Sequence, residues 1–167
     1  MTPSIRVPRW LAFLLLIGLP VWGATLRAAE AHYQVQLVWG TDDPNAKSGD
    51  MKVLAPEIRE RLRQLRWKSY FVVKSEVASI PAKESKRVAL SDRCAVELKE
   101  LPNGHLEVKM FSLKPGSDSK EVASKTMSLK ELAEGKLIIY AGDSKDRWDD
   151  AWLVIVGEDK PAAPPKP

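Results

Sequence analysis

Cysteine and histidine are the side chains here best suited to covalent catalysis, and both are scarce. The sequence holds one cysteine, Cys94, and two histidines, His32 and His105. A catalytic cysteine needs a base, usually histidine, within hydrogen-bond reach. If the chain turns at Asn103 and Gly104, Cys94 and His105 fall toward opposite ends of a hairpin, about 25–30 Å apart. We therefore expect Cys94 to be a structural thiol, with a reactive thiol as the alternative.

Aspartates gather in two polar loops, and oxygen-rich loops are what calcium requires. They are Asp42, Asp43 and Asp50 in the first loop, and Asp143, Asp146, Asp149 and Asp150 in the second. Neither loop follows EF-hand spacing, and aspartate is common in ordinary turns and helix caps. The sequence also lacks a phosphate-binding glycine loop, a CxxC pair, an HExxH zinc helix and a GxSxG elbow. We therefore predict neither a metal site nor a cofactor.

Three arginines are candidate ligand-binding residues. Arg59, Arg63 and Arg66 are spaced by four and three residues, so a helix would bring them to one face. Such a ridge could bind an anionic envelope polymer, phospholipid head groups or an acidic protein. The alternative is an ordinary solvated helix face, because neighbouring glutamates dilute the positive field.

Tryptophan supplies the fourth candidate. Trp148 lies among aspartates in a polar loop, where it could anchor a partner or a sugar ring, or fold back over a sheet edge. Trp39, Trp67 and Trp152 lie at or next to predicted strands. We expect these three to pack in the core or against the sheet.

One segment has the periodicity of a helix. Between Val53 and Leu65, four apolar residues fall on one narrow arc at helical spacing: Leu54, Ile58, Leu62 and Leu65. Pro56 cannot donate a backbone hydrogen bond and disfavours helical geometry just before it, so the regular part should begin near Pro56. This is the one substantial helix that the sequence predicts.

The rest of the chain has the pattern of strands. Apolar and polar residues alternate, or β-branched and aromatic residues gather, in 33–39, 67–74, 87–90, 94–101, 105–113, 121–127, 137–140 and 151–156. Ser128 and Glu131 form a capping box that opens a short helical turn, which Gly135 should end. The predicted fold class is α+β, mostly β: a single domain with an antiparallel sheet of about seven to eight strands and one main helix packed on it.

The segments 94–101 and 105–113 form the most definite prediction. They flank Pro102-Asn103-Gly104, and Asn-Gly readily adopts the positive φ that a tight β-hairpin turn requires. The alternation then directs five apolar side chains toward the core: Val96, Leu98, Leu106, Val108 and Met110.

The two ends of the chain differ from its middle. Arg6 and Arg9 precede an apolar run of about 13 residues, shorter than the roughly 20 that cross a bilayer, which is typical of a secretory signal peptide. We expect residues 1–31 to be a cleaved leader, 32–158 a globular domain and 159–167 a proline-rich disordered tail. Removing the leader lowers the formal charge from +4 to +2, too little to favour nucleic acid as a partner. An uncleaved, membrane-tethered form is the alternative.

These patterns together favour binding over catalysis. The leading hypothesis is an exported bacterial domain, periplasmic or extracellular, that acts as a binding or structural accessory protein. Its expected partner is a protein or an anionic envelope polymer, and we expect no transmembrane span in the mature form. The alternative is a secreted hydrolase of envelope material that depends on carboxylates alone, as glycosidases do.

Overall fold

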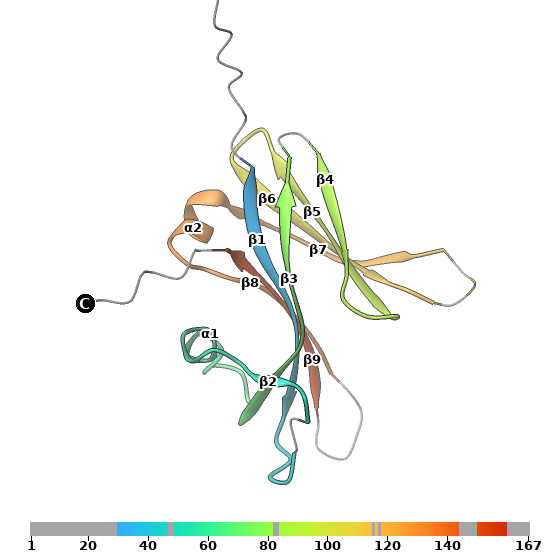
Figure 1. The fold of residues 1–167 in the computed structure, drawn as a ribbon. Helices are drawn as coiled ribbons and strands as arrows, with labels where there is room; N and C mark the ends of the chain where they lie inside the picture. The colour runs from blue at the N-terminus through green and yellow to red at the C-terminus, as the bar shows by residue number, and fades with distance from the viewer. Residues whose placement is uncertain are drawn as a thin grey trace, which may run out of the picture.

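Strands make up most of the molecule (Figure 1). The computed structural model describes residues 30–46, 49–81, 84–114, 116, 118–143 and 150–159. In chain order its elements are β1 (Ala31–Thr41), β2 (Lys52–Val53), α1 (Pro56–Arg61), β3 (Ser69–Ile80), β4 (Ser85–Ala89), β5 (Cys94–Leu101), β6 (His105–Ser112), β7 (Lys120–Ser128), α2 (Leu129–Ala133), β8 (Ile138–Asp143) and β9 (Ala151–Glu158). The expected tail beyond Asp159, nearly all of the expected leader, and Trp148 lie outside the described residues.

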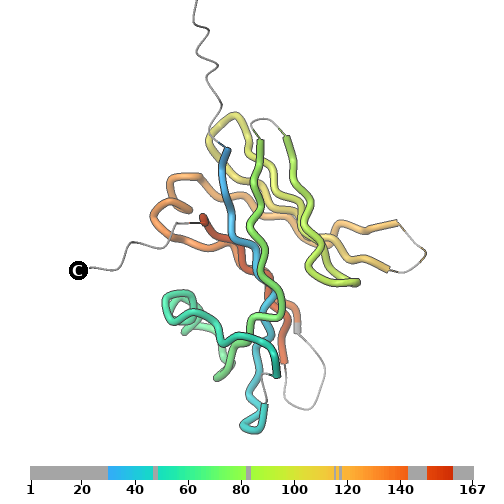
Figure 2. The backbone as a smooth tube through the Cα atoms, in the orientation of Figure 1, coloured from blue at the N-terminus to red at the C-terminus, as the bar shows by residue number. Residues whose placement is uncertain are grey.

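The strands form two antiparallel sheets, so the predicted β-rich fold is confirmed but the single sheet of seven to eight strands is wrong. A five-stranded sheet has the order β2-β3-β1-β9-β8, and a four-stranded sheet has the order β4-β5-β6-β7. The end of β3 and the beginning of β4 lie next to each other where the chain passes between the sheets (Figure 2). Two sheets packed face to face each bury an apolar face, which a lone sheet with short helices could not do.

The main core lies between the two sheets. Alternate side chains of the five-stranded sheet, such as Val35 and Leu37 on β1, meet alternate side chains of the four-stranded sheet. Four of the five hairpin residues predicted to face the core are fully buried there: Val96, Leu98, Leu106 and Val108. Met110, the fifth, is partly buried against the same cluster. Leu98 pairs with Val108 and Val96 with Met110, as the alternation predicts.

A second core cluster lies on the other face of the five-stranded sheet, under the segment that contains α1. It consists of Val38, Leu54, Leu62, Trp67, Tyr70, Ala151, Leu153 and Ile155. Strand β9 therefore contributes Val154 and Val156 to one cluster and Leu153 and Ile155 to the other. A strand buried on both faces explains the nearly continuous apolar run in its sequence.

Helix α1 is shorter than predicted, and neither helix dominates the fold. It begins at Pro56, as expected, but ends at Arg61 after six residues. The chain then tightens: Leu62 N–H donates to the carbonyl of Arg59 at 2.9 Å, and Leu65 N–H to that of Leu62 at 2.8 Å. These i→i+3 bonds still direct Leu62 into the second core cluster, so the apolar stripe is buried without a long helix.

The capping box predicted at the start of α2 is present, and it yields a pH prediction. Ser128 Oγ accepts from Glu131 N–H at 3.2 Å, and Glu131 accepts in return from Ser128 N–H at 3.4 Å. Hydrogen bonds from Lys136 and then from Ser128 lower the pKa of Glu131 from 4.5 to about 2. Its contribution to stability should be fully present above pH 4.5 and lost as the pH falls toward about 2.

The comparison of wild type with Glu131→Gln measures this contribution. Urea unfolding should show a stability advantage of the wild type at neutral pH that shrinks between pH 4.5 and about 2. An advantage that stays constant over that interval would show that the carboxylate is not what stabilises the cap.

Candidate functional site

At one end the five-stranded sheet extends past the four-stranded sheet (Figure 1). Residues of both sheets line a groove between them at this end. We call it the inter-sheet groove; its volume is about 580 Å³. Its floor is built by Leu37, Val73, Tyr140, Gly142 and Val154, its rim by Ser91, Asp92, Arg93, Cys94 and Met110, and the exposed Trp152 lies at its mouth. The lining is mostly apolar, which is typical of ligand sites.

Strand pairing fixes the floor of the inter-sheet groove. Leu37 on β1 pairs with Val154 on β9, which pairs with Tyr140 on β8. The Tyr140 hydroxyl donates to the carbonyl of Val108 on the four-stranded sheet, so it ties the two sheets together at the back of the groove. Val73 is the extra residue of a β-bulge in β3, where the pairing with β1 shifts register.

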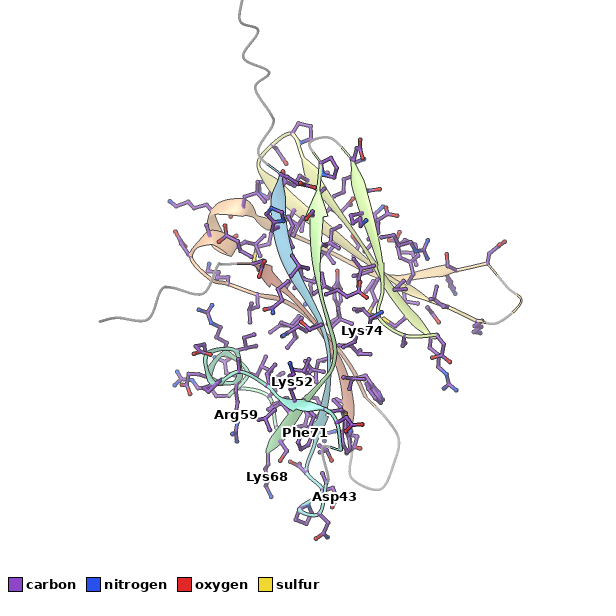
Figure 3. The ribbon with its side chains drawn as sticks, viewed as in Figure 1. Asp43, Lys52, Arg59, Lys68, Phe71 and Lys74 are labelled. Atoms are coloured by element: carbon purple, nitrogen blue, oxygen red, sulfur yellow. The ribbon has the colours of Figure 1, made fainter. Side chains whose placement is uncertain are left out.

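A row of apolar side chains continues from the groove across the projecting part of the five-stranded sheet. Cross-strand pairing aligns Val53 with Phe71, Phe71 with Trp39, and Trp39 with Trp152. The rings of Trp39 and Phe71 are 5.5 Å apart, and Phe71 is labelled on this part of the sheet in Figure 3. Trp152 belongs to both the row and the groove.

Trp152 is the functional candidate that the sequence did not reveal. Trp67 is buried, as expected, but Trp152 is 48% exposed and therefore does not lie in the core. Trp39 is partly buried, and its indole N–H donates to Asp150 at 2.8 Å. The sequence pattern gave no signal of this exposure, because Trp152 lies in the run 151–156, which is apolar at every position.

Cys94 lies on the rim of the inter-sheet groove, at the other end of the hairpin from His105. It pairs with Ser112, whereas His105 pairs with Leu101, so seven residue steps, or about 23 Å, separate them along the hairpin. The predicted separation of Cys94 and His105 is thereby confirmed. Burial raises the pKa of the Cys94 thiol, which disfavours the reactive thiolate.

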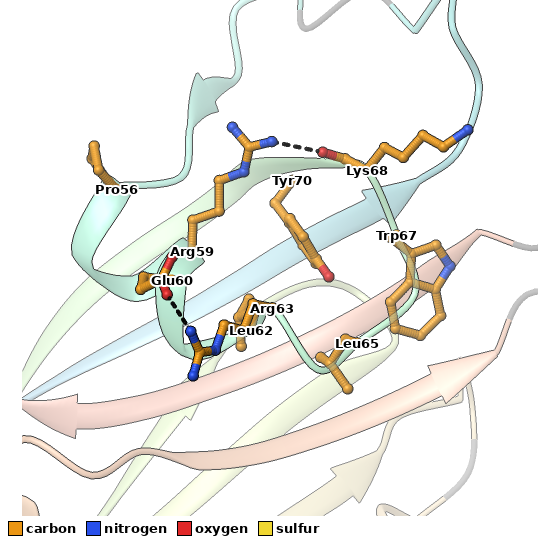
Figure 4. A pocket seen from close by; sticks show the side chains of 9 residues that line it. All are labelled: Pro56, Arg59, Glu60, Leu62, Arg63, Leu65, Trp67, Lys68 and Tyr70. Atoms are coloured by element: carbon orange, nitrogen blue, oxygen red, sulfur yellow. Dashed lines mark hydrogen bonds and ion pairs between the residues drawn. The ribbon is translucent and has the colours of Figure 1, made fainter.

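The arginines predicted to share one helical face are not on one helix, because α1 ends at Arg61. Arg59 and Arg63 line a pocket of about 560 Å³ beside α1, but Arg66 is not among its lining residues (Figure 4). Arg59 donates to the carbonyl of Lys68 at 3.0 Å, and Arg63 pairs with Glu60 at 3.0 Å.

Each of the three arginines has a different partner. Arg66 lies over the ring of Trp67, with 5.3 Å from Cζ to the ring centroid. Figure 4 shows the guanidinium groups of Arg59 and Arg63 apart from each other. The Tyr70 hydroxyl is directed toward Leu62 and Leu65, not toward either guanidinium group. The structure therefore does not bring the three arginines together as one cationic surface.

The first aspartate loop has structural roles. Asp42 accepts from the backbone N–H of Lys68 at 2.9 Å, and Asp43 accepts from that of Asn45 at 2.8 Å, as in an Asx turn. Within the described ranges, no group of three or more metal-ligating side chains could hold an ion. Asp146 and Asp149 of the second loop lie outside those ranges.

Two further observations do not depend on a single site. Of the helices in the described part of the structure, none is long and apolar enough to span a bilayer. Comparison with family models, with curated proteins and with solved structures found no match for this sequence.

Proposed function

We propose that this chain is an exported, non-catalytic binding domain of the bacterial cell envelope, and that the inter-sheet groove is its binding surface. The observation that carries the proposal is the position of Trp152: a large apolar side chain, 48% exposed, at the mouth of a concave apolar site. Exposed apolar surface of this kind marks sites of interaction on soluble domains.

The charges of the groove support an apolar ligand over an anionic polymer. Among its described lining residues, Arg93 is the single cation and Asp92, beside it in sequence, the single anion. Their fields largely cancel, so the groove offers no net charge to steer a polyanion. We therefore place an apolar part of an envelope component ahead of an anionic polymer as the partner.

The chemistry of the lining favours binding over hydrolysis. Carboxylate-dependent hydrolysis needs a pair of carboxyl groups flanking the substrate, whereas Asp92 is the single carboxylate that the structure describes in this groove. Cys94 lies about 23 Å from His105 along the hairpin and so lacks the base that a cysteine nucleophile requires.

Binding of an environment-sensitive apolar dye, anilinonaphthalene sulfonate, tests the proposal. Trp152→Ala should weaken dye binding about tenfold, because it removes a large part of the apolar contact surface. Val122→Ala is the matched control, because Val122 is 49% exposed and does not line the groove. Equal dye affinity in the wild type and Trp152→Ala, or none in either, would contradict the proposal.

The same preparation tests export. The full chain is expressed in a bacterial host and the protein is purified from the periplasmic fraction, where its N-terminus should begin near His32. Recovery of the intact chain from Met1 in the cytosol would contradict the proposed destination.

A further inference from the structure

We propose that the inter-sheet groove holds one linear acyl chain of a single-chain amphiphile, with the polar head in solvent at the mouth. This inference rests on the proposed binding function and names the ligand class. It follows from three features of the groove: its hydrogen bonding, its dimensions and its adaptable rim.

Three polar groups along the groove already have partners within the protein. The Tyr140 hydroxyl donates to the Val108 carbonyl, and Ser91 Oγ accepts from the backbone N–H of Arg93 at 3.2 Å. The carbonyl of Cys94 accepts from the N–H of Ser91 at 3.0 Å. A peptide, sugar or nucleobase lying on the apolar floor would leave donors and acceptors of its own unpaired there, at a cost of about 1–3 kcal/mol for each group. An aliphatic chain has none to leave unpaired.

The floor has the length and shape of an extended chain. Leu37, Val154 and Tyr140 pair directly on β1, β9 and β8, and Val73 of the β3 bulge, next to Lys74, the partner of Leu37, continues the row onto a fourth strand. Three inter-strand spacings of about 4.8 Å make this row about 14 Å long. That is about the length of ten to twelve aliphatic carbons in an extended chain, estimated from carbon–carbon bond lengths. The volume of about 580 Å³ suits a single chain of this size.

The rim can adapt to a chain lying on the floor. Met110 and Cys94 are partly buried where the four-stranded sheet ends over the floor. Methionine is unbranched and flexible, so Met110 can change rotamer to admit an aliphatic chain at little cost. Trp152 at the mouth then covers the outer part of the chain, while exposed Arg93 and Asp92 lie on the solvent side, where a polar head remains hydrated.

The single cysteine of the chain reports whether the groove is occupied. A water-soluble maleimide should label Cys94 at least tenfold more slowly in full-chain protein saturated with dodecanoate, below its micelle-forming concentration, than in protein without it. Across saturated fatty acids from eight to twelve carbons, affinity should rise about fourfold for each methylene. Beyond about a dozen carbons it should level off, because the floor is only about 14 Å long.

A relocated cysteine controls for indirect effects. In the double variant Cys94→Ser, Ser124→Cys, the thiol lies at an exposed position on β7 that does not line the groove. Dodecanoate should leave the labelling rate of this variant unchanged. Trp152→Ala in the wild-type background should weaken protection of Cys94, whereas Val122→Ala should not.

The outcomes separate this inference from the proposed function. If dodecanoate gives no protection while Trp152-dependent dye binding persists, the acyl proposal is overturned and the binding function stands. If the dye shows no Trp152-dependent binding either, both are overturned. Protection by phosphatidylglycerol vesicles but not by dodecanoate would overturn the single-chain assignment, because it would identify a two-chain lipid as the ligand.

Discussion

Leu98→Ala should lower the free energy of unfolding by about 2–5 kcal/mol. Leu98 is 0% exposed on β5 and belongs to the cluster between the two sheets. Truncation removes apolar contacts to both sheets and leaves a cavity that strands cannot collapse to fill, because each is held by hydrogen bonds to its neighbours. For a domain with a total stability of about 5–15 kcal/mol, this loss is a large fraction.

Urea unfolding of the wild type and Leu98→Ala measures the loss as a lower midpoint with an unchanged slope. Lys99→Ala is the matched control, because the neighbouring side chain is exposed on the same strand. Its effect should stay within about 0.5 kcal/mol. A loss below about 1 kcal/mol for Leu98→Ala would mean that no second sheet covers this face of the hairpin.

The hairpin could be predicted from the sequence because its determinants are local. The turn at Pro102–Gly104 and the alternation on either side of it lie within a few residues of one another, and Gly104 has the positive φ of 73° that a tight turn favours. Ser128 and Glu131 likewise determine the start of α2 within one turn. In these segments the nearest neighbours in sequence are also the decisive contacts.

The division of the strands between two sheets could not be predicted in the same way. Val35 and Leu98 belong to one cluster although 63 positions separate them in the sequence. Each strand carries the same alternation whether its apolar face meets a helix or another sheet. The bulge at Val73 also has no local signal, because Tyr70–Val73 carries no charged residue and can shift register without burying a charge.

The candidate site follows from where one sheet ends. In β9, Trp152 faces the same side as Val154, which the four-stranded sheet buries, but it pairs with Trp39 beyond the end of that sheet. An apolar run marks positions that avoid water in most contexts, and it cannot show how far the covering layer extends. The prediction that three arginines share one helical face was wrong because it required the helix to continue to Arg66, whereas α1 ends at Arg61.

Leu62→Ala should also lower the free energy of unfolding by about 2–5 kcal/mol, although Leu62 lies just outside a helix. A six-residue helix is too short to be stable by itself, since isolated helices below about 12–15 residues are marginal in water. The segment around α1 must therefore be held mainly by its apolar contacts. Leu62, 0% exposed, belongs to the second core cluster together with Trp67 and with Leu153 and Ile155 of β9.

The control for this variant separates packing from helix formation. Glu60→Ala replaces an exposed residue of α1 with a better helix former and removes only a surface ion pair, so it should change stability by at most about 1 kcal/mol. A loss for Glu60→Ala as large as that for Leu62→Ala would show that the helix and its surface pairs, rather than burial, hold this layer in place.

The double variant Leu62→Ala, Leu98→Ala then tests whether the two core clusters are independent. Leu62 and Leu98 belong to separate clusters on opposite faces of the five-stranded sheet, and packed layers lie about 10 Å from one another. Residues that far apart with no shared partner lose stability additively, to within about 0.5 kcal/mol. The loss of the double variant could instead be smaller, by 1 kcal/mol or more, than the sum of the two single-variant losses. That result would mean that the two cavities share the same packing, which contradicts a sheet lying between them.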